Sequence, residues 1–585
     1  MTAAARSGWL GLGAAMLGAC GSPSQVGAAP PEPPLAPLDS NYQARDFRDE
    51  VIYEALTDRF DDADPSNDSL DGISAIPGNL ARYQGGDWQG LTRHLDYIRD
   101  LGATAIWISP IVQNVPRETE QDGYHGYWAS DFTQLNGHFG DLADLQALVA
   151  AAHALGLRVF LDIAPNHAGP VFYYDFDGDG RVSPADLEPP FASAGPYPAP
   201  LIWTQHPALF LGAAPPNDAL SAPSTALMRL PLSEQHFHRR GNLADFANQN
   251  EVELGDFPTG VRGLRDLATE NPVVAQGLID TNAEWIRLTD VDGLRLDAVP
   301  CIDRAFWVQF CSGLRERLAA FGKHDFFLFG EVFSGDSATV ASYTSLPGSM
   351  DSAFDFSFKH DVVEGYVLQG GAAVGARAAL ETDRQFYATS SEPDGVGLDP
   401  WQGRVAFVDN HDTGRILSEL DDPRAARVAL TLLFTLDAIP SVYYGTEQGF
   451  SGGYGDASRE PLWTAKFHEN APLFGYIRRL SAVRRATLAL RRGTLVVRYA
   501  SEHDGRSSAP DAGLLALERE YQGERVLVAV NAHAFQASTA EVSTGFAPGA
   551  RLHDALGSDA APEVKPGGLV MLRIGARESV VLVSD

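Results

Sequence analysis

Residues 292–298 read Asp-Gly-Leu-Arg-Leu-Asp-Ala, and this stretch decides the fold of the 585-residue chain. Gly293 to Leu296 is a short buried-strand candidate with an acid on each side. Side chains alternate along a strand, so Arg295 and Asp297 lie on the same side of it. Arg295 can therefore pair with Asp297 and keep that carboxylate ionised.

Seven further apolar, β-rich runs flank this stretch in the sequence. They are Val51 to Ala55, Ala103 to Ile108, Leu157 to Ile163, Phe326 to Phe329, Ser352 to Phe356, Arg404 to Val408 and Ser441 to Tyr444. Most of the gaps have room for a helix, so the eight runs predict a parallel α/β architecture. The pattern favours a closed (β/α)8 TIM barrel, which places its active site at the carboxyl ends of its strands.

The chain divides into five predicted parts. Residues 45–167 and 257–489 form the barrel, and residues 168–256, rich in Pro, Gly and Asp, form a subdomain inserted after the third strand. Beyond residue 490 the pattern changes to short β segments, which predicts a C-terminal antiparallel β-sandwich over residues 490–585. Residues 1–20 are a predicted signal peptide, and residues 21–44 are a Pro-rich tether.

The N-terminal residues have the features of an export signal. Arg6 precedes the apolar run Trp9 to Ala19, which is too short to span a bilayer and is followed by Cys20. The ending Leu17-Gly18-Ala19-Cys20 resembles a bacterial lipoprotein signal, which implies acyl chains on Cys20 and attachment to the cell envelope. An ordinary secretion signal and a wrongly chosen start codon are the alternatives. No other run reaches about 18 apolar residues, so the lipid anchor would be the only membrane attachment.

Composition and charge exclude some classes of protein. Hydrophobic residues make up 44% of the chain and charged residues 21%, so a wholly disordered chain is excluded. The net charge of −32 repels a phosphate backbone and disfavours nucleic acid as a partner. Separately, we expect the protein to be a monomer. Three cysteines exclude a disulfide framework, and Cys301 and Cys311 are expected to be buried free thiols.

Polar motifs follow four of the predicted strands. They are Asp162-Ile163-Ala164-Pro165-Asn166-His167, Arg295-Leu296-Asp297, Gly330-Glu331 and Asp409-Asn410-His411-Asp412. Their order resembles the α-amylase superfamily of glycoside hydrolases (family thirteen), and most closely its cyclodextrin glucanotransferases and related α-amylases. The phrases at residues 85–90, 124–128 and 443–448 carry the same resemblance, which covers roughly residues 45–585.

The resemblance implies cleavage of α-1,4-glucosidic bonds with retention, by two carboxyl groups about 5–5.5 Å apart. Asp297 would be the nucleophile, Glu331 the general acid/base, and Asp412 a third carboxylate that binds sugar hydroxyls. Burial among acids should raise the pKa of Glu331 so that it holds its proton near neutrality. The residues implied around the bound sugar are Arg295, His125, Tyr127, Trp128, His167, His411, Asp162 and Arg459.

Simpler structural roles stay open for some of these residues. Asp162 could serve mainly to orient Arg295, Tyr127 and Trp128 could be core aromatics, and His125 could be an ordinary buried histidine.

Two positions depart from the family pattern. Pro300 and Cys301 stand where many amylases and glucanotransferases have Lys-His, although trehalose-forming relatives share the Pro. Gly241 precedes the phrase Asn242 to Asp245, where glucanotransferases hold a bulky aromatic around which the glucan curls. Without that aromatic we expect hydrolysis over transfer.

Oxygen-rich segments predict up to three calcium sites. Residues 175–186 fit the spacing of an EF-hand loop, with ligands at Asp175, Asp177, Asp179, the carbonyl of Arg181, Ser183 and Asp186. An acidic surface turn is the alternative. By resemblance alone, an N-terminal site would use Asp62, Asp64, Asn67, Asp68, the carbonyl of Gly85 and Asp87. A third site, also by resemblance, would use Asn166, Asp245 and the carbonyl of Cys301.

The sequence therefore predicts an exported, lipid-anchored endo-hydrolase of α-1,4-glucans such as starch or maltodextrin, with Ca²⁺ as its cofactor. A transglycosylase on the same scaffold is the nearest alternative, and a non-catalytic glucan-binding protein at the cell surface is a second. The products formed from glucan separate the first two, and the complete set of three carboxylates argues against the last.

Overall fold

Eight parallel strands form the centre of the protein in the computed structural model, which describes residues 42–204, 210–213, 228–258 and 263–584. Their order is β18-β17-β16-β9-β4-β1-β20-β19, and a parallel bridge between Phe354 and Val405 brings the two edge strands together. The predicted (β/α)8 barrel is confirmed. The strands are β1 (Ile52–Ala55), β4 (Ala105–Ile108), β9 (Arg158–Ile163), β16 (Gly293–Leu296), β17 (Phe327–Gly330), β18 (Ser352–Ala353), β19 (Val405–Phe407) and β20 (Ile439–Tyr443).

Aromatic side chains fill the barrel towards the amino ends of the strands. Phe160 and Phe327 belong to this buried aromatic cluster. Gly293 makes room for it, because a Cβ there would lie 2.8 Å from the Phe160 ring and 2.5 Å from the Phe327 carbonyl oxygen. Since side chains alternate along a strand, the next inward positions are Asp162 and Arg295, which are register partners in β9 and β16. The aromatic layer thus supports a charged layer at the carboxyl ends of the strands.

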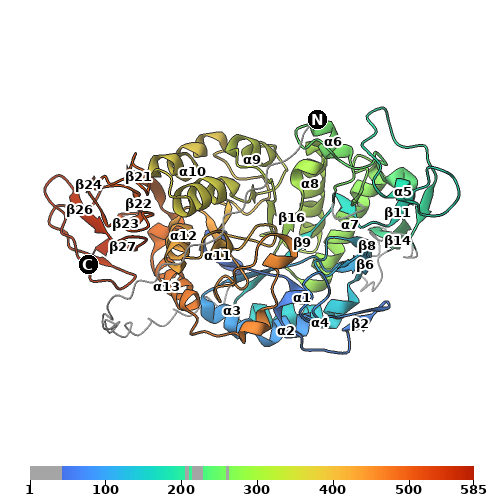
Figure 1. Cartoon of the computed structure of the whole chain (residues 1–585), viewed down its shortest axis with the longest axis horizontal. Helices are drawn as coiled ribbons and strands as arrows, with labels where there is room; N and C mark the ends of the chain where they lie inside the picture. Colours follow the sequence, from blue (N-terminus) through green and yellow to red (C-terminus); the bar gives the residue numbers. More distant parts are fainter. Residues whose placement is uncertain (1–41, 205–209, 214–227, 259–262, 585) are drawn as a thin grey trace, which may run out of the picture. The chain divides into compact units, whose positions relative to one another are not determined.

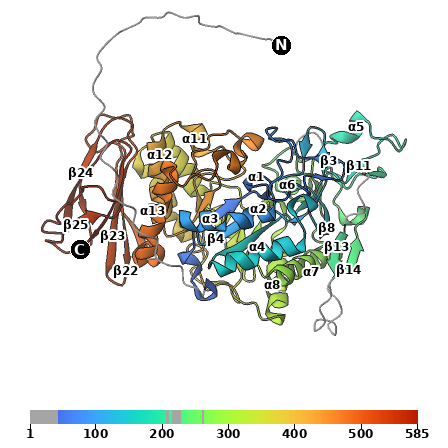
Figure 2. The ribbon, with the colours of Figure 1, turned by 90° about the horizontal axis from the view of Figure 1, so that it is seen from below.

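Helices cover the outside of the barrel. Figure 2 shows α4 (Leu142–Ala154), α7 (Pro272–Thr289) and α8 (Arg304–Ala320) beside one another, and α7 packs against both of the others. Each of the three begins at an Asp or Asn side chain that accepts a backbone amide hydrogen, which is a favourable N-cap. The other helices are α1 (Thr57–Phe60), α2 (Trp88–Arg93), α3 (Leu95–Leu101), α9 (Ser337–Thr344), α10 (Arg377–Leu380), α11 (Ile416–Glu419), α12 (Pro423–Thr435), α13 (Pro472–Ala486), α14 (Leu488–Arg492) and a π-helix at Phe358–Leu368.

The segment after β9 leaves the barrel as a set of short paired strands (Figure 1). The β10–β15 pair joins the start of this segment to its end, so the chain returns to the barrel beside His167. The elements of the segment are β10 (His167–Ala168), β11 (Phe172–Tyr174), α5 (Pro184–Leu187), β12 (Leu201–Trp203), β13 (Phe210–Ala213), β14 (Met228–Pro231), α6 (Gln249–Leu254) and β15 (Arg265–Asp266). Earlier short strands are β2 (Ser69–Leu70), β3 (Ile73–Ser74), β5 (Val112–Asn114), β6 (Arg117–Glu118), β7 (Gln121–Asp122) and β8 (Ala129–Leu135).

Residues 494–584 form two antiparallel sheets (Figure 1). One sheet has the order β21-β22-β23-β27-β25, and the other pairs β24 with β26. Leu514 and Leu527 of the first sheet share a buried core with Val542 and Val570 of the second. The predicted C-terminal β-sandwich is therefore confirmed. Its strands are β21 (Thr494–Ala500), β22 (Leu514–Tyr521), β23 (Glu524–Asn531), β24 (Ser538–Ser543), β25 (Leu552–Asp554), β26 (Leu569–Ile574) and β27 (Ser579–Ser584).

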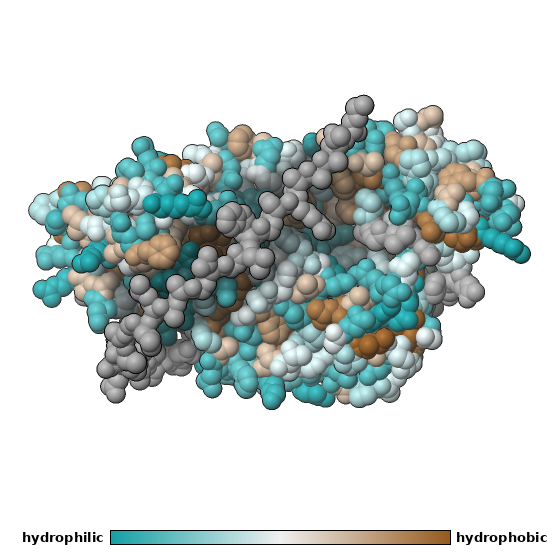
Figure 3. All heavy atoms as spheres, viewed as in Figure 1, coloured by the Kyte–Doolittle hydropathy of each residue, from teal (hydrophilic) through white to brown (hydrophobic). Residues whose placement is uncertain are grey.

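The predicted signal peptide and the tether as far as residue 41 lie outside the described residues. Within the described ranges, every helix is too short or too polar to cross a membrane. Hydrophilic residues are spread over the face seen in Figure 3, which is in keeping with the net charge of −32.

Both described cysteines are buried free thiols, as predicted. Cys301 ends the short 3-10 helix Val299–Cys301, whereas Cys311 lies in α8, so the two thiols belong to separate elements.

Candidate active site

One arginine joins the two carboxyl groups that were predicted to react. Arg295 Nη1 lies 2.6 Å from Asp297 Oδ1, and Arg295 Nη2 lies 3.0 Å from Glu331 Oε2. The backbone amide of Ala298 donates to the same Glu331 oxygen at 3.2 Å. Within the described part of the chain, these contacts leave the second oxygen of each carboxyl group for a substrate.

Asp162 holds Arg295 from the neighbouring strand. Arg295 Nη1 donates to Asp162 Oδ1 at 2.9 Å, while Trp107 Nε1 and the Tyr127 hydroxyl donate to Asp162 Oδ2 at 3.1 and 2.8 Å. Because both oxygens of Asp162 accept hydrogen bonds from protein groups, the geometry favours the alternative in which Asp162 orients Arg295.

Asp412 lies between His411 and Arg459. His411 Nε2 is 3.0 Å from Asp412 Oδ2, and Arg459 Nη2 is 3.2 Å from Asp412 Oδ1. The Asp412 side chain is 36% exposed, so it can meet a ligand while these two cations hold it. The half-buried Tyr127 ring stacks on the His411 ring with centroids 5.4 Å apart. These four residues therefore form one connected group.

Glu54 is a site residue that the sequence analysis missed. It lies on β1, it is 2% exposed, and its Oε1 accepts a hydrogen bond from Nδ1 of His411 at 2.6 Å. The available signal was an acid inside the apolar run Val51 to Ala55, because a buried carboxylate needs a partner.

The pKa values of Glu331 and Asp412 are shifted in opposite directions by burial and by neighbouring charges. Burial raises the pKa of Glu331 to about 7, although Arg295 opposes the shift. Burial also works against an ionised Asp412, but the His411 and Arg459 cations outweigh it and hold the pKa of Asp412 below its usual range. At neutral pH Glu331 can therefore carry a proton while Asp412 is ionised, which is the division of labour of an acid and a charge-binding group.

His125, His167 and Trp128 are buried around the turn that carries Tyr127. The Tyr127 amide donates to His125 Nδ1 at 3.0 Å, and His167 Nε2 lies 3.1 Å from the Tyr127 carbonyl oxygen. Burial lowers the pKa of both histidines, so their rings are neutral near pH 7. Trp128 is 4% exposed and packs edge-on against His125, which favours the alternative of a core aromatic.

Two exposed aromatic rings on the segments around the candidate carboxyl groups were also missed. Phe333, two residues after Glu331, is 57% exposed and packs on Phe356 with ring centroids 4.6 Å apart. Tyr454 is 68% exposed, and its ring lies 3.5 Å from the position of a Cβ at Gly414, two residues after Asp412. Exposed aromatic rings suit stacking on sugars, but exposure could not be read from sequence.

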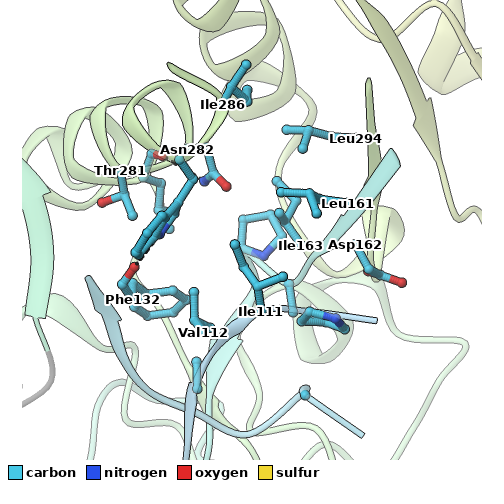
Figure 4. A pocket seen from close by; sticks show the side chains of 17 residues that line it. Ile111, Val112, Phe132, Leu161, Asp162, Ile163, Thr281, Asn282, Ile286 and Leu294 are labelled. Atoms are coloured by element: carbon cyan, nitrogen blue, oxygen red, sulfur yellow. Dashed lines mark hydrogen bonds between the residues drawn. The ribbon is translucent and has the colours of Figure 1, made fainter. Parts of the chain in front are cut away.

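A small apolar cavity lies behind β9, between the sheet and α7, and Asp297, Glu331 and Asp412 are not among the residues that line it (Figure 4). Figure 4 shows the Asp162 side chain pointing away from the other side chains that line it. Its volume of about 30 Å³ holds no more than one or two water molecules, so it is too small for a sugar ring.

The residues of the predicted N-terminal calcium site converge on Gly85. A Cβ at Gly85 would lie 2.5 Å from Asp68 Oδ1 and 3.5 Å from Asp62 Oδ2. Buried oxygens of Asp62, Asn67 and Asp68 have no hydrogen-bond partner within the described ranges. Burial, and then the neighbouring acids, raise the pKa of Asp62 to about 6. Orphaned, mutually repelling oxygens are the donor set that a hard cation requires, so these residues fit calcium.

Asp64 and Asp87 shape the same loop through other contacts. Asp87 Oδ2 accepts the amides of Ala63 and Asp64 at 3.0 and 2.7 Å, and its Oδ1 caps α2 through the Gly90 amide at 2.6 Å. Asp64 Oδ1 accepts the Ser66 hydroxyl at 2.7 Å.

The EF-hand-like loop brings three of its predicted ligands together. One carboxylate oxygen from each of Asp175, Asp177 and Asp179 lies within 4.8 Å of the others. Asp186 is used differently: its oxygens accept the amides of Phe176 and Ser183 at 3.0 and 2.7 Å, which closes the loop and caps α5. The amide of Arg181 likewise donates to Asp179 Oδ1 at 2.7 Å. The loop thus gathers Asp175, Asp177 and Asp179, whereas both carboxylate oxygens of Asp186 accept backbone amides.

The third predicted calcium site is only partly assembled. Cys301 packs against Leu243 and Val252, so its segment lies beside the one that carries Asp245. Asp245 is exposed and accepts the Ala247 amide at 3.0 Å, while the buried amide of Asn166 lies 3.3 Å from His167 Nδ1. The contacts of Asn166 and Asp245 are thus separate from each other.

Comparison with known proteins agrees with this geometry. A family model described as "Alpha amylase, catalytic domain" matches residues 54–186 and 257–470, and the unmatched stretch between them lies in the inserted segment. An alpha-amylase of Streptomyces lividans is 33% identical over 86% of this chain, and the chain spans 57% of that relative's length.

Two solved structures resemble the whole described fold. An Anoxybacillus alpha-amylase matches with a TM-score of 0.70 and 28% identity, covering 92% of this chain and 99% of that one. A cyclomaltodextrin glucanotransferase with a three-domain ABC distribution matches with a TM-score of 0.71 and 27% identity, again covering 92% and 99%. With the catalytic-domain match extending over more than half of its residues, this chain belongs to the alpha-amylase family.

Proposed function

We propose that the protein is an endo-acting hydrolase of α-1,4-glucosidic bonds in starch or maltodextrin that works with retention. The observation that carries the proposal is the shared contact of Arg295 with Asp297 and Glu331. Retention needs one ionised and one protonated carboxyl group beside the same glycosidic bond. Arg295 Nη1 donates to Asp297 Oδ1 at 2.6 Å, and the raised pKa of Glu331 favours its protonated form.

In the first step the glycosidic bond is exchanged for a bond to the enzyme. Asp297 Oδ1 is held by Arg295, so the electron pair of Oδ2 attacks the anomeric carbon. As the bond from that carbon to the leaving glucan breaks, the proton on Glu331 passes to the departing oxygen. Asp412 meanwhile binds hydroxyl groups of the sugar that carries the reacting carbon.

The second step releases the sugar and restores both carboxyl groups. Glu331, now a carboxylate, takes a proton from water, and the water oxygen attacks the anomeric carbon. The bond to Asp297 breaks, and the two inversions give net retention. If a sugar hydroxyl replaces the water, the same step becomes transglycosylation.

Linear, short α-maltooligosaccharides are the expected products from soluble starch, with little cyclodextrin. Gly241 supports this prediction: its φ is 75°, and a Cβ there would lie 2.5 Å from the Pro190 carbonyl oxygen, so no aromatic can stand at this position. Chromatography of the products from starch, pullulan and maltotriose measures this, with NMR of the first anomer released. Abundant cyclodextrins would contradict hydrolysis, and a β-anomeric product would contradict retention.

Transglycosylation is the second candidate, because the exposed Phe333 ring beside Glu331 could bind an acceptor sugar as well as a leaving one. A glucanotransferase among the solved structures that resemble the chain supports the same alternative.

The kcat/KM for hydrolysis of starch is expected to decrease as the pH rises through about 7. Glu331 must be protonated to protonate the leaving oxygen, and burial raises its pKa to about 7. Its protonated fraction therefore decreases above that pH, and kcat/KM decreases with it. Initial rates of starch hydrolysis in buffers from pH 5 to 9 measure this decrease. A flat profile across pH 7 would show that Glu331 is not the acid.

We further propose that calcium is a structural cofactor. The fit is best at the N-terminal loop, where Asp62, Asn67 and Asp68 have unpartnered buried oxygens and the carboxyl groups of Asp62 and Asp68 lie beside Gly85. The Asp175, Asp177 and Asp179 group is a second candidate. Bound there, a cation would neutralise clustered carboxylates and hold its loop, and it would take no part in bond cleavage.

Removal of calcium by EDTA is expected to lower the melting temperature by several degrees or more, because a ligand that binds only the folded state stabilises it. Asp68→Asn should abolish most of the EDTA effect if the N-terminal site dominates. The matched variant Asp177→Asn should remove only the contribution of the EF-hand-like loop. Unchanged melting of the EDTA-treated parent protein would refute all the predicted sites.

Export and attachment through acyl chains on Cys20 are proposed on the N-terminal sequence alone, and a monomeric state is proposed with them.

A further inference from the structure

Glu54 and His411 form a buried pair below Asp412. Glu54 Oε1 lies 2.6 Å from His411 Nδ1 and accepts the His411 backbone amide at 3.3 Å. Glu54 is 2% exposed and His411 is 1% exposed, so the pair is shielded from solvent. No step of the mechanism above uses Glu54.

The contacts of His411 require a hydrogen on both ring nitrogens. His411 Nε2 lies 3.0 Å from Asp412 Oδ2 and 2.9 Å from the Tyr127 hydroxyl, whose own hydrogen goes to Asp162. Ionised carboxylates only accept hydrogen bonds, and a neutral imidazole has a single N–H. A neutral His411 could therefore donate a hydrogen bond to Glu54 or to Asp412 but not to both. Its unprotonated ring nitrogen would then lie against an anionic carboxylate oxygen.

Other charged groups around His411 come from several strands and loops. Burial works against a protonated ring, but the carboxylates of Asp412 and Glu54 outweigh it and raise the pKa of His411 to about 10. Burial also raises the pKa of Glu54, and the hydrogen bonds and charge of His411 oppose that shift. A proton on the ring satisfies both Glu54 and Asp412, whereas a proton on Glu54 would leave His411 with a single N–H. The charged and titratable groups that contact the pair or interact with it electrostatically are Asp412, Tyr127, Asp162, Glu331, Arg295, Arg459, His125 and Tyr443.

We propose that Glu54 is a positioning residue that keeps His411 in its doubly protonated form and so holds Asp412 in place for binding glucan hydroxyls at neutral and alkaline pH. This inference rests on the proposed function, because it gives Asp412 the role of a sugar ligand. Glu54 touches no substrate itself.

The experiment measures binding of maltoheptaose by calorimetry between pH 6 and 9, in a Glu331→Gln background. That background stops turnover and removes the titration of Glu331. We expect affinity to be nearly constant with pH when Glu54 is present. Adding Glu54→Gln removes the negative charge but keeps an acceptor oxygen, so the pKa of His411 should fall by about 1–3 units. Affinity should then be near the parent value at pH 6 and about tenfold weaker at pH 9, as one charged hydrogen bond is lost.

Two controls separate positioning from stability. Glu447→Gln removes another fully buried carboxylate, which accepts the Tyr53 and Tyr97 hydroxyls, and it should lower the melting temperature without adding a pH dependence to binding. Glu54→Asp keeps the charge and should retain more of the alkaline affinity than Glu54→Gln.

The titration of His411 is measured directly by NMR of labelled histidine, with His411→Asn to assign the signal. In the parent protein the ring should remain an imidazolium above pH 8, and a ring that titrates near pH 6.5 would overturn the inference even if no Glu54 variant folds. An equal pH dependence of binding with and without the Glu54→Gln substitution would also overturn it. If the Glu331→Gln protein binds no maltoheptaose at any pH, the proposed function fails instead.

Discussion

Replacing Glu331 by glutamine is expected to lower kcat/KM for soluble starch by about 10²–10⁴-fold, the usual contribution of general acid–base catalysis. Glutamine keeps the shape of the side chain and an oxygen for the Ala298 amide, which donates to Glu331 at 3.2 Å. It has no proton to give to a leaving sugar oxygen. The fold and the contacts of Asp297 with Arg295 should persist, so the loss should be chemical rather than structural.

The choice of substrate separates the acid from the nucleophile. Fluoride leaves without protonation, so Glu331→Gln should form the glycosyl-enzyme from α-maltosyl fluoride far faster, relative to the parent, than it cleaves starch. Asp297→Asn should be inactive on both substrates, because no carboxylate remains to attack the anomeric carbon. Starch hydrolysis at the parent rate by Glu331→Gln would show that the assigned mechanism is wrong.

Replacing Arg295 by methionine is expected to cost about 3–5 kcal/mol of stability, the usual result when one partner of a buried ionic group is removed. Arg295 is completely buried and contacts Asp162, Asp297 and Glu331. Arg295 holds down the pKa values of Asp162 and Glu331, so without it the pKa values of these two carboxyl groups in the folded state rise further. A buried carboxyl group without a cationic partner destabilises the folded state most when it is ionised, and ionisation increases with pH. The loss of stability should therefore be larger at pH 8 than at pH 5.

Urea unfolding at the two pH values measures this effect. Adding Asp162→Asn to Arg295→Met should recover part of the lost stability, because one uncompensated carboxylate is removed, and the double-mutant cycle gives the coupling. Arg519→Met is a matched control: Arg519 is as deeply buried, but it donates to the carbonyls of Thr435, Leu490 and Gly493. It should lower stability and leave the activity of the folded protein intact. A loss in Arg295→Met that does not depend on pH would contradict the charge-pairing account.

The barrel could be predicted, and its candidate carboxyl groups could be proposed, because their signals are local. Each barrel strand is a short apolar run, and strand alternation places Arg295 and Asp297 on one side without knowledge of any other strand. The positions of Glu331 and Asp412 directly after such runs were likewise readable from sequence, given that parallel strands present their carboxyl ends at one face.

Spacing along the chain was less reliable where the backbone competes for the same side chain. Asp186 has the position of the last ligand in a calcium loop, but it caps α5 through the amides of Phe176 and Ser183. Asp245, a predicted ligand of the third calcium site, likewise accepts a nearby backbone amide. Short acidic side chains satisfy local backbone donors before they reach distant partners.

The sequence by itself determined the fold class from its strand pattern, and the resemblance of its strand-end motifs named the carboxyl groups that we propose to react. Only the tertiary structure decided what supports and surrounds them. Glu54 meets His411 across 357 residues of sequence, and Phe333 and Tyr454 are exposed only because of how their loops pack. Contacts of that kind arise when the barrel closes and β1 takes its place beside the last strand, and no local pattern encodes the closure.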